Sequence, residues 1–167
     1  MKVELIDKMG TDLSVVNAAR VSYAKEKEEF EESDERLIRY LAEHKHWSPF
    51  AHTFLSFRIK APVFVARQLV KHQVGLVWNE ESRRYITYDP EIYNIRKWRK
   101  KPDSSKQGSG EQILISTELN LEVNEHLQQG LSLYNRLLLE NVAPEQARAV
   151  LPQSMYTNWI WSGTLYA

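Results

Sequence analysis

The chain has 167 residues, 22 basic and 22 acidic side chains, and no cysteine. A neutral chain of this length is expected to form one domain with its own core, and its charge gives no indication of binding to nucleic acid or to an anionic membrane. The lack of cysteine excludes disulfides, thiolate metal sites and thiol nucleophiles within the chain. No apolar run is long enough to cross a bilayer and no signal peptide is recognisable, so we predict a cytoplasmic protein.

The first part of the chain predicts alternating strands and short helices. Met1–Asp7 alternates apolar and polar residues, which is typical of a strand, and Ser14–Ala24 is expected to be a short helix. The charge run Lys25–Glu35 predicts a solvated loop or helix face. Asp34–His44 carries apolar residues at helical spacing, and Thr53–Ile59 returns to the alternation of a strand.

A further helix is predicted between Pro62 and Gly75. Proline suits the first turn of a helix, and glycine commonly follows its last turn. Residues four apart lie on one face of a helix, so a polar stripe is expected beside an apolar face. The stripe pairs Arg67 with Lys71 and Gln68 with His72.

The second part of the chain is predicted to be mainly helical. Trp98–Gly110 is rich in Lys, Ser and Gly and is expected to be a mobile surface loop. Glu111–Asn141 shows the pattern of a long helix, with Gly130 as a weak point. Another helix is expected to begin at Pro144, and the aromatic segment Ser154–Ala167 is also predicted to be helical.

The stretch from Arg67 to Tyr85 gathers cations and hydrogen-bonding side chains among valines and leucines. These charges could simply form surface ion pairs, each worth about 0–1 kcal/mol. They could also form an anion site, because arginine grips phosphate with two hydrogen bonds and Asn, Ser and Glu can bind a base or a sugar. The chain has neither the glycine-rich dinucleotide fingerprint nor a Walker loop.

A metal site and a serine nucleophile are not predicted. Histidines occur at His44, His46, His52 and His72, but no carboxylate or thiolate stands at the spacing of a zinc site. No serine lies in the elbow motif of a serine hydrolase.

The charged stretch resembles the signature of the flavin-dependent thymidylate synthases, which reads R-H-R-x-x-S-x-N-E-x-S-x-R. Lys71-His72-Gln73 matches the first three positions, and Asn79-Glu80, Ser82 and Arg84 match the end. This chain has one residue more between the two parts, and two of the first three positions are changed. Three further segments resemble the family in the family's order: Asn17–Lys25, Ser48–Gln68 and Pro144–Gly163.

The resemblance implies an α+β fold, with a twisted, largely antiparallel sheet packed against long helices. It implies an enzyme that converts deoxyuridylate to thymidylate, with methylenetetrahydrofolate as carbon donor. Reduced FAD would supply the hydride and NADPH would reduce the flavin. It also implies a homotetramer with active sites between subunits. The flavin-free thymidylate synthases use a cysteine, which this chain does not contain.

The resemblance also implies the roles of individual residues. Arg84 and Arg148 would take the phosphate, while Glu80 and Ser82 would orient base and sugar, and Glu80, Ser82 and Arg84 form the implied catalytic set. The implied deoxyuridylate contacts are Gln68, Leu69, Val70, Lys71, Glu80, Glu81, Ser82, Arg83, Arg84 and Arg148. The implied FAD contacts are Ser22, His52, Thr53, Lys71, His72, Gln73, Asn79 and Glu80.

Other interpretations stay open at this point. Ser22 and Thr53 could be structural hydroxyls, and Arg148 could be a helix-surface cation. Residues 1–167 are expected to form a single catalytic domain without the family's C-terminal segment, whose helix carries an arginine that faces the pyrimidine. Three functions therefore remain: an active enzyme, a truncated relative that binds nucleotide or flavin without turnover, and a helical interaction protein.

Overall fold

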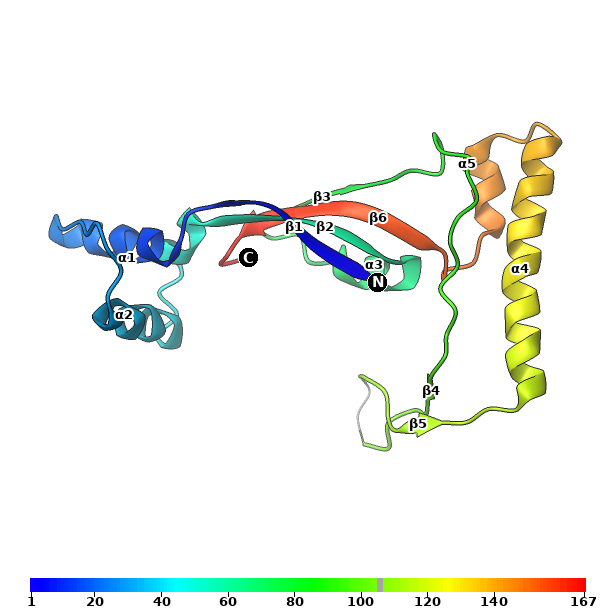
Figure 1. Ribbon diagram of the computed structural model, residues 1–167, viewed down its shortest axis with the longest axis horizontal. Helices are drawn as coiled ribbons and strands as arrows, with labels where there is room; N and C mark the ends of the chain where they lie inside the picture. The colour runs from blue at the N-terminus through cyan, green and yellow to red at the C-terminus, as the bar shows by residue number, and fades with distance from the viewer. Residues whose placement is uncertain (105–106) are drawn as a thin grey trace. The chain divides into compact units, whose positions relative to one another are not determined.

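A computed structural model describes residues 1–104 and 107–167 of the chain (Figure 1). The chain folds into two compact units. The first unit contains Met1–Ala61, Ala66–Glu81 and Thr157–Ala167. The second contains Pro62–Val65 and Ser82–Tyr156.

A four-stranded sheet forms the framework of the first unit. Its strands follow the order β1-β2-β6-β3, with bounds β1 (Lys2–Met9), β2 (Phe54–Pro62), β6 (Tyr156–Thr164) and β3 (Leu76–Glu80). β1 pairs antiparallel with β2, and β3 pairs antiparallel with β6. The strands predicted at Met1–Asp7 and Thr53–Ile59 are confirmed as β1 and β2.

The two middle strands, β2 and β6, also run antiparallel. The backbone N–H of Leu165 donates to the carbonyl of Thr53 over 3.2 Å. The hydroxyls of Ser56 and Ser162 lie 2.8 Å apart. Partner numbers rise along one strand as they fall along the other, so the whole sheet is antiparallel, as expected for the fold class.

The helix predicted at the C-terminal end of the chain is wrong, because this segment forms β6. The buried residues Thr157, Trp159 and Gly163 are separated by two and four positions, and Ile160 between them is exposed. This alternation is that of a strand, which aromatic and β-branched side chains favour. Gly163 is required here: a Cβ at this position would lie 2.6 Å from the carbonyl oxygen of Gly75.

Two helices and two short 3-10 turns complete much of the first unit. α1 (Asp12–Arg20) is followed by a 3-10 turn at Val21–Tyr23, and α2 (Glu32–Glu43) precedes a second turn at Ser48–His52. Val15 and Val16 of α1 are buried, and α1 contacts both α2 and the second turn. The helices predicted at Ser14–Ala24 and Asp34–His44 are confirmed with shifted ends.

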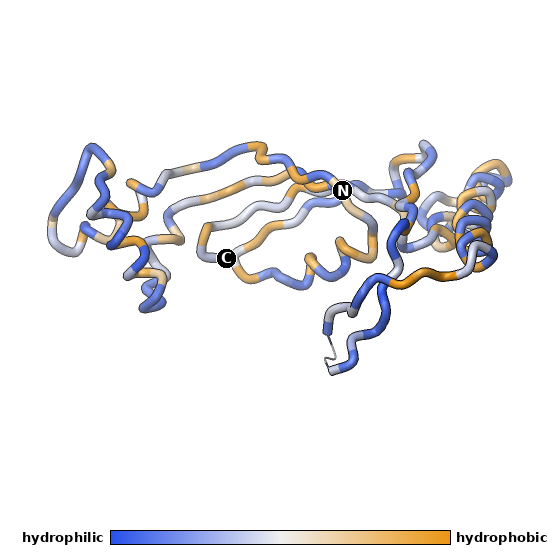
Figure 2. The backbone as a smooth tube through the Cα atoms, turned by 60° about the horizontal axis from the view of Figure 1, so that its bottom comes forward, coloured by the Kyte–Doolittle hydropathy of each residue, from blue (hydrophilic) through white to orange (hydrophobic). Residues whose placement is uncertain are grey.

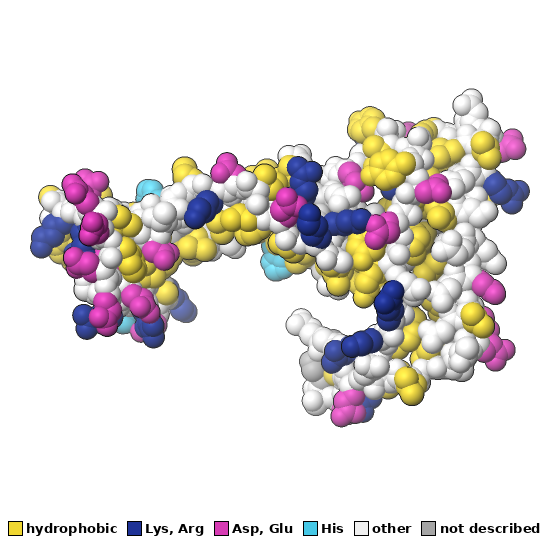
Figure 3. Space-filling model, viewed as in Figure 1, with side chains coloured by type: hydrophobic (Ala, Val, Ile, Leu, Met, Phe, Trp, Pro, Cys, Tyr) yellow, Lys and Arg dark blue, Asp and Glu magenta, His cyan; other side chains and the backbone are white. Residues whose placement is uncertain are grey.

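The charged run after α1 is a folded loop around a buried carboxylate, so its prediction as a solvated segment is wrong at Asp34. Asp34 is fully buried and accepts hydrogen bonds from Lys27 Nζ at 2.6 Å and Arg20 Nη2 at 2.9 Å. The backbone N–H of Glu31 donates to the same Asp34 oxygen as Lys27. These donors, with Lys27 the strongest, lower the pKa of Asp34 from 3.8 to about 2. Acidic and basic side chains gather around α1 and α2 (Figure 3).

The helix that begins after Pro62 is shorter than predicted. α3 covers Val63–Leu69, and the chain then turns towards β3. Gly75 has a φ of +72°, a left-handed conformation that glycine adopts without strain. It stands at the entry to β3 and does not cap α3.

The long helix α4 (Thr117–Leu139) dominates the second unit. Ser116 caps it, since its hydroxyl accepts the N–H of Leu119 at 3.1 Å. Hydrophobic and hydrophilic residues alternate around α4 (Figure 2). The prediction of a long helix is confirmed, with a later start.

Gly130 is a place of close approach on α4, and its effect on the stability of the helix stays a prediction. A Cβ on Gly130 would lie 3.2 Å from the carbonyl oxygen of Val150. α5 (Pro144–Ala147) leads into the 3-10 turn Arg148–Val150, and both contact α4. The missing side chain of Gly130 therefore allows this turn to pack on the long helix.

The predicted loop Trp98–Gly110 lies partly outside the described residues. Its described ends are held in a short hairpin of β4 (Trp98–Arg99) and β5 (Gln112–Ile113). The indole N–H of Trp98 donates to Asn120 of α4 at 2.9 Å.

Candidate functional site

Glu80, at the end of β3, has a carboxylate held by two donors. The hydroxyl of Thr157 donates to Glu80 Oε1 over 2.6 Å. The indole N–H of Trp78 reaches Oε2 at 3.3 Å. Glu80 itself is exposed, whereas Thr157 is buried. The arrangement fixes the carboxylate at the protein surface with lone pairs left for a ligand.

Tryptophan rings pack beside this carboxylate on β3 and β6. Trp78 stacks on Trp159 with ring centroids 4.4 Å apart and meets Trp161 edge to face at 5.9 Å. Trp159 is buried, with 2% of its surface exposed. These rings make the end of β3 a firm support for Glu80.

The residues next to Glu80 differ in their surroundings. Glu81 is tied to β6, because its carboxylate accepts the Asn158 amide at 2.7 Å and its N–H donates to the Asn158 carbonyl. Asn79 is exposed and pairs with Ile160 across the sheet. The structure thus brings Glu81 and Glu80 onto one strand end, each with its own partner on β6.

The end of α3 and the segment between α3 and β3 present polar side chains to solvent. Gln68, Lys71, His72 and Gln73 are exposed, and Leu69 and Val70 are half-buried. These residues supply hydrogen-bond donors and acceptors of three kinds: an ammonium, an imidazole and two amides. Such a set can hydrogen-bond to the edge of a heterocyclic ring.

Of the remaining flavin residues predicted from sequence, Ser22 and His52 lie on the two 3-10 turns of the first unit and Thr53 directly follows the second turn. Ser22 and His52 are exposed. Thr53 is buried, and its hydroxyl donates to the carbonyl of Phe50 at 3.0 Å. This bond favours the structural interpretation of Thr53, while its role towards flavin stays a prediction.

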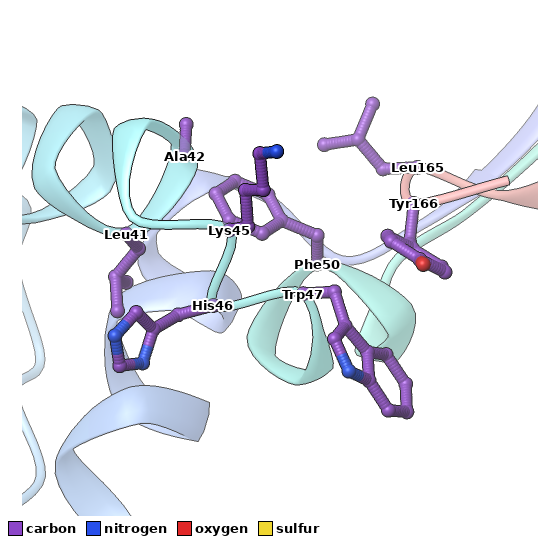
Figure 4. A pocket seen from close by; sticks show the side chains of 8 residues that line it. All are labelled: Leu41, Ala42, Lys45, His46, Trp47, Phe50, Leu165 and Tyr166. Carbon is purple, nitrogen blue, oxygen red and sulfur yellow. The ribbon is translucent and has the colours of Figure 1, made fainter.

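A hollow beside the second turn was missed by sequence reasoning (Figure 4). It has a volume of about 470 Å³, and the rings of Trp47 and Tyr166 stand on one side of it with centroids 5.1 Å apart. Trp47 directly precedes the quoted segment that starts at Ser48, so its position next to a family-like segment was the available signal. The hollow is lined by Leu41, Ala42, Lys45, His46, Trp47, Phe50, Leu165 and Tyr166.

In the second unit, Arg84 and Arg148 converge on Glu145. Arg84 Nε lies 3.5 Å from the carboxylate of Glu145, and Arg148 Nε donates to the backbone carbonyl of the same residue at 3.3 Å. Both guanidiniums are exposed. The two arginines therefore contact the same residue, one at its side chain and the other at its backbone, and their binding of a phosphate stays a prediction. Glu145 was missed from sequence, although it stands in the quoted segment that begins at Pro144.

Arg83 and Ser82 have different surroundings. Arg83 is 5% exposed, donates to the carbonyl of Tyr88 and lies over the Tyr88 ring at 4.7 Å. The Ser82 hydroxyl accepts the N–H of Arg84 at 3.3 Å and the Ser82 carbonyl accepts that of Tyr85. Arg83 therefore supports the turn that carries Arg84, and its contact with deoxyuridylate stays a prediction.

The described part of the chain contains neither a metal-binding cluster nor a membrane-spanning helix. Within residues 1–104 and 107–167, His, Cys, Asp and Glu side chains do not form a group of three or more that could hold a metal ion. In the same residues, no helix has the length and apolar character needed to cross a membrane.

The sequence matches a family model over residues 4–167, and that model is described as thymidylate synthase complementing protein. The chain is 42% identical to a flavin-dependent thymidylate synthase of Kosmotoga olearia, covering 96% of this chain and 70% of that protein. It is 40% identical to the flavin-dependent thymidylate synthase of Thermus thermophilus, covering 98% of this chain and 60% of that protein.

A solved structure agrees with the sequence comparisons. A UMP/dUMP methylase, PolB from Streptomyces cacaoi, bound with 5-Br dUMP, superposes with a TM-score of 0.77 at 34% identity. The match covers 98% of this chain and 73% of that protein. The chain therefore has the fold of this solved structure. The chain belongs to the flavin-dependent thymidylate synthase family.

Proposed function

We propose that this protein converts deoxyuridylate to thymidylate in a flavin-dependent reaction. The observation that carries the proposal is the convergence of Arg84 and Arg148, far apart in the sequence, on Glu145. These are the two residues that the family resemblance assigns to the phosphate. A pair of exposed guanidiniums supplies the charge and the hydrogen-bond geometry that a phosphate monoester needs.

Within this proposal the chain's own residues bind and orient the nucleotide. Arg84 and Arg148 hold the phosphate, and Glu80 and Ser82 orient the base and the sugar. The chain has no cysteine, so no thiol of its own can add to C6 of the uracil. The nucleophilic character of C5 must then come from electrostatic interactions with the base and from the flavin.

The exposed donors and acceptors between α3 and β3 are chemically suited to a flavin. Lys71, His72 and Gln73 would hydrogen-bond to its ring system, with His52 and Ser22 as further contacts. When bound, reduced FAD supplies the hydride that completes the methyl group. The protein's contribution is to position flavin and nucleotide relative to one another.

Several finer features belong to the same proposal. Methylenetetrahydrofolate would be the carbon donor and NADPH the reductant of the flavin. The protein would act in the cytoplasm as a homotetramer, with residues 1–167 contributing to one catalytic domain. If flavin lies between subunits, dilution to monomers should release it, and a monomer that retains flavin would contradict the tetrameric arrangement.

Two measurements test the proposed function. The purified protein should show the absorbance band of bound flavin, and it should release tritium from deoxyuridylate labelled at C5 when NADPH and methylenetetrahydrofolate are present. Bound flavin without tritium release would leave a binding protein that lacks turnover. A colourless protein that also fails to bind deoxyuridylate would refute the proposal.

A further inference from the structure

We propose that Thr157 is a positioning residue for the nucleotide site, because it sets the orientation of the Glu80 carboxylate. The inference rests on the proposed function, in which Glu80 contacts the deoxyuridylate. Thr157 lies outside the signature motif and is separated from Glu80 by most of the second half of the chain. It acts on the ligand only through Glu80.

The geometry of the two side chains is that of a strong, oriented hydrogen bond. The Thr157 hydroxyl and Glu80 Oε1 are 2.6 Å apart, within the range of hydroxyl to carboxylate bonds. Thr157 is 2% exposed, so its hydroxyl is fixed within the packed layer. A buried donor therefore holds an exposed carboxylate, which would otherwise move among several rotamers.

The sheet register explains why these two residues meet. Glu80 pairs with Trp159 across β3 and β6. Thr157 precedes Trp159 by two positions, so both point to the same face of the sheet. Thr157 is thus the diagonal neighbour of Glu80, close enough for a long side chain to reach it.

A second donor acts on the other carboxylate oxygen. Trp78 Nε1 lies 3.3 Å from Glu80 Oε2, and the Trp78 ring is held by its stack on Trp159. With one donor on each oxygen, the plane of the carboxylate is defined. The remaining lone pairs of both oxygens stay available to accept hydrogen bonds from a nucleotide.

Two substitutions separate positioning from simple support of the sheet. Thr157→Val removes the hydroxyl and keeps the shape, whereas Thr157→Ser removes a buried methyl and keeps the hydroxyl. If Thr157 positions Glu80, Thr157→Val weakens deoxyuridylate binding about tenfold and Thr157→Ser leaves it within about twofold. A structural role alone predicts no such difference between the two, because the loss of a buried methyl also lowers stability.

The matched control is Ser162→Ala. It removes another hydroxyl of β6, whose 2.8 Å bond to Ser56 crosses the same sheet. Deoxyuridylate affinity, the flavin spectrum and the thermal midpoint are measured for all variants by titration, absorbance and thermal unfolding. Ser162→Ala should leave the affinity unchanged. Equal losses for Ser162→Ala and Thr157→Val, or an unchanged affinity of Thr157→Val, would overturn the inference.

Two further variants cover the other outcomes. If Thr157→Val does not fold, Thr157→Ala removes the same hydroxyl and should also weaken binding about tenfold; an unchanged affinity overturns the inference. Glu80→Gln tests the proposed function separately. A loss of affinity for Glu80→Gln with none for Thr157→Val refutes the positioning role alone, and no effect of Glu80→Gln refutes both.

Discussion

Arg84 and Glu145 form an ion pair in the second unit, with Nε and Oε2 at 3.5 Å. Arg148 is bound to the backbone of the same glutamate. A carboxylate therefore lies where the proposed phosphate site has its positive charge. This relationship makes the affinity of the site for a phosphate depend on a competing anion from the chain itself.

Glu145→Gln should raise the affinity for deoxyuridylate. Both partners of the pair are about half exposed, so the pair contributes about 0–1 kcal/mol, and its removal should tighten binding by up to about fivefold. Calorimetric titration at low and high salt measures the change, which salt should diminish. Glu122→Gln, an equal charge change on α4, is the control and should have no effect. Weaker binding to Glu145→Gln would show instead that Glu145 orients the arginines.

Arg84→Ala should weaken deoxyuridylate binding. Loss of a charge-assisted contact to the phosphate costs about 1.5–3 kcal/mol. Titration of the variant with deoxyuridylate and with deoxyuridine separates a phosphate contact from a general effect, because the nucleoside should bind both proteins alike. Arg39→Ala on α2 removes a surface arginine paired with Glu35 and serves as the control. Unchanged nucleotide affinity would count against the role of Arg84.

His72→Ala should weaken the binding of FAD more than the binding of deoxyuridylate. His72 is exposed in the turn between α3 and β3, and its imidazole is one of the proposed flavin contacts. The flavin retained through gel filtration and the affinity for deoxyuridylate are compared with those of His126→Ala, an exposed histidine of α4. The opposite order of losses would mean that the nucleotide and flavin residues are interchanged.

The protein should lose stability in acid through Asp34. The Lys27 ammonium and the other donors lower the pKa of Asp34 to about 2, below the ordinary value of 3.8. A carboxyl with a depressed pKa stabilises the fold above its unfolded pKa, and this stabilisation is lost as the pH falls through the folded pKa. Thermal unfolding between about pH 5 and pH 2 should therefore show a falling midpoint.

Asp34→Asn provides the comparison for this acid effect. It should be less stable at neutral pH, because Lys27 and Arg20 lose their charged partner, and it should show a smaller fall of the midpoint between pH 5 and pH 2. A midpoint that falls equally in both proteins would assign the acid effect to other carboxyls.

Local patterns predicted much of the chain, and the errors have identifiable causes. Alternation predicted β2, and the helical pattern of Glu111–Asn141 predicted a long helix that contains α4. The segment that forms β6 was predicted as a helix from its many aromatic residues. The alternation of buried and exposed positions along it was not used. Asp34 was placed in solvent because a run of charges does not reveal which carboxylate becomes enclosed.

Some residues of the candidate site could be identified from the sequence, and others only from the structure. The signature motif identified Glu80 and Arg84 as residues with chemistry, and the family-like segment Pro144–Gly163 identified Arg148, since residue type and order are sequence properties. It did not identify Thr157 or Glu145, because neither has an unusual residue type or spacing. Their importance lies in contacts made across the sheet and across a turn.

The sequence by itself determined the family, the absence of a thiol nucleophile and the set of side chains available to bind a nucleotide. Only the tertiary structure decided which residues these side chains contact. Glu80 is bound by Thr157, and Arg84 and Arg148 both contact Glu145. The physical reason is that hydrogen bonds and ion pairs depend on separations of a few ångströms, which strand register and helix packing set between residues distant along the chain.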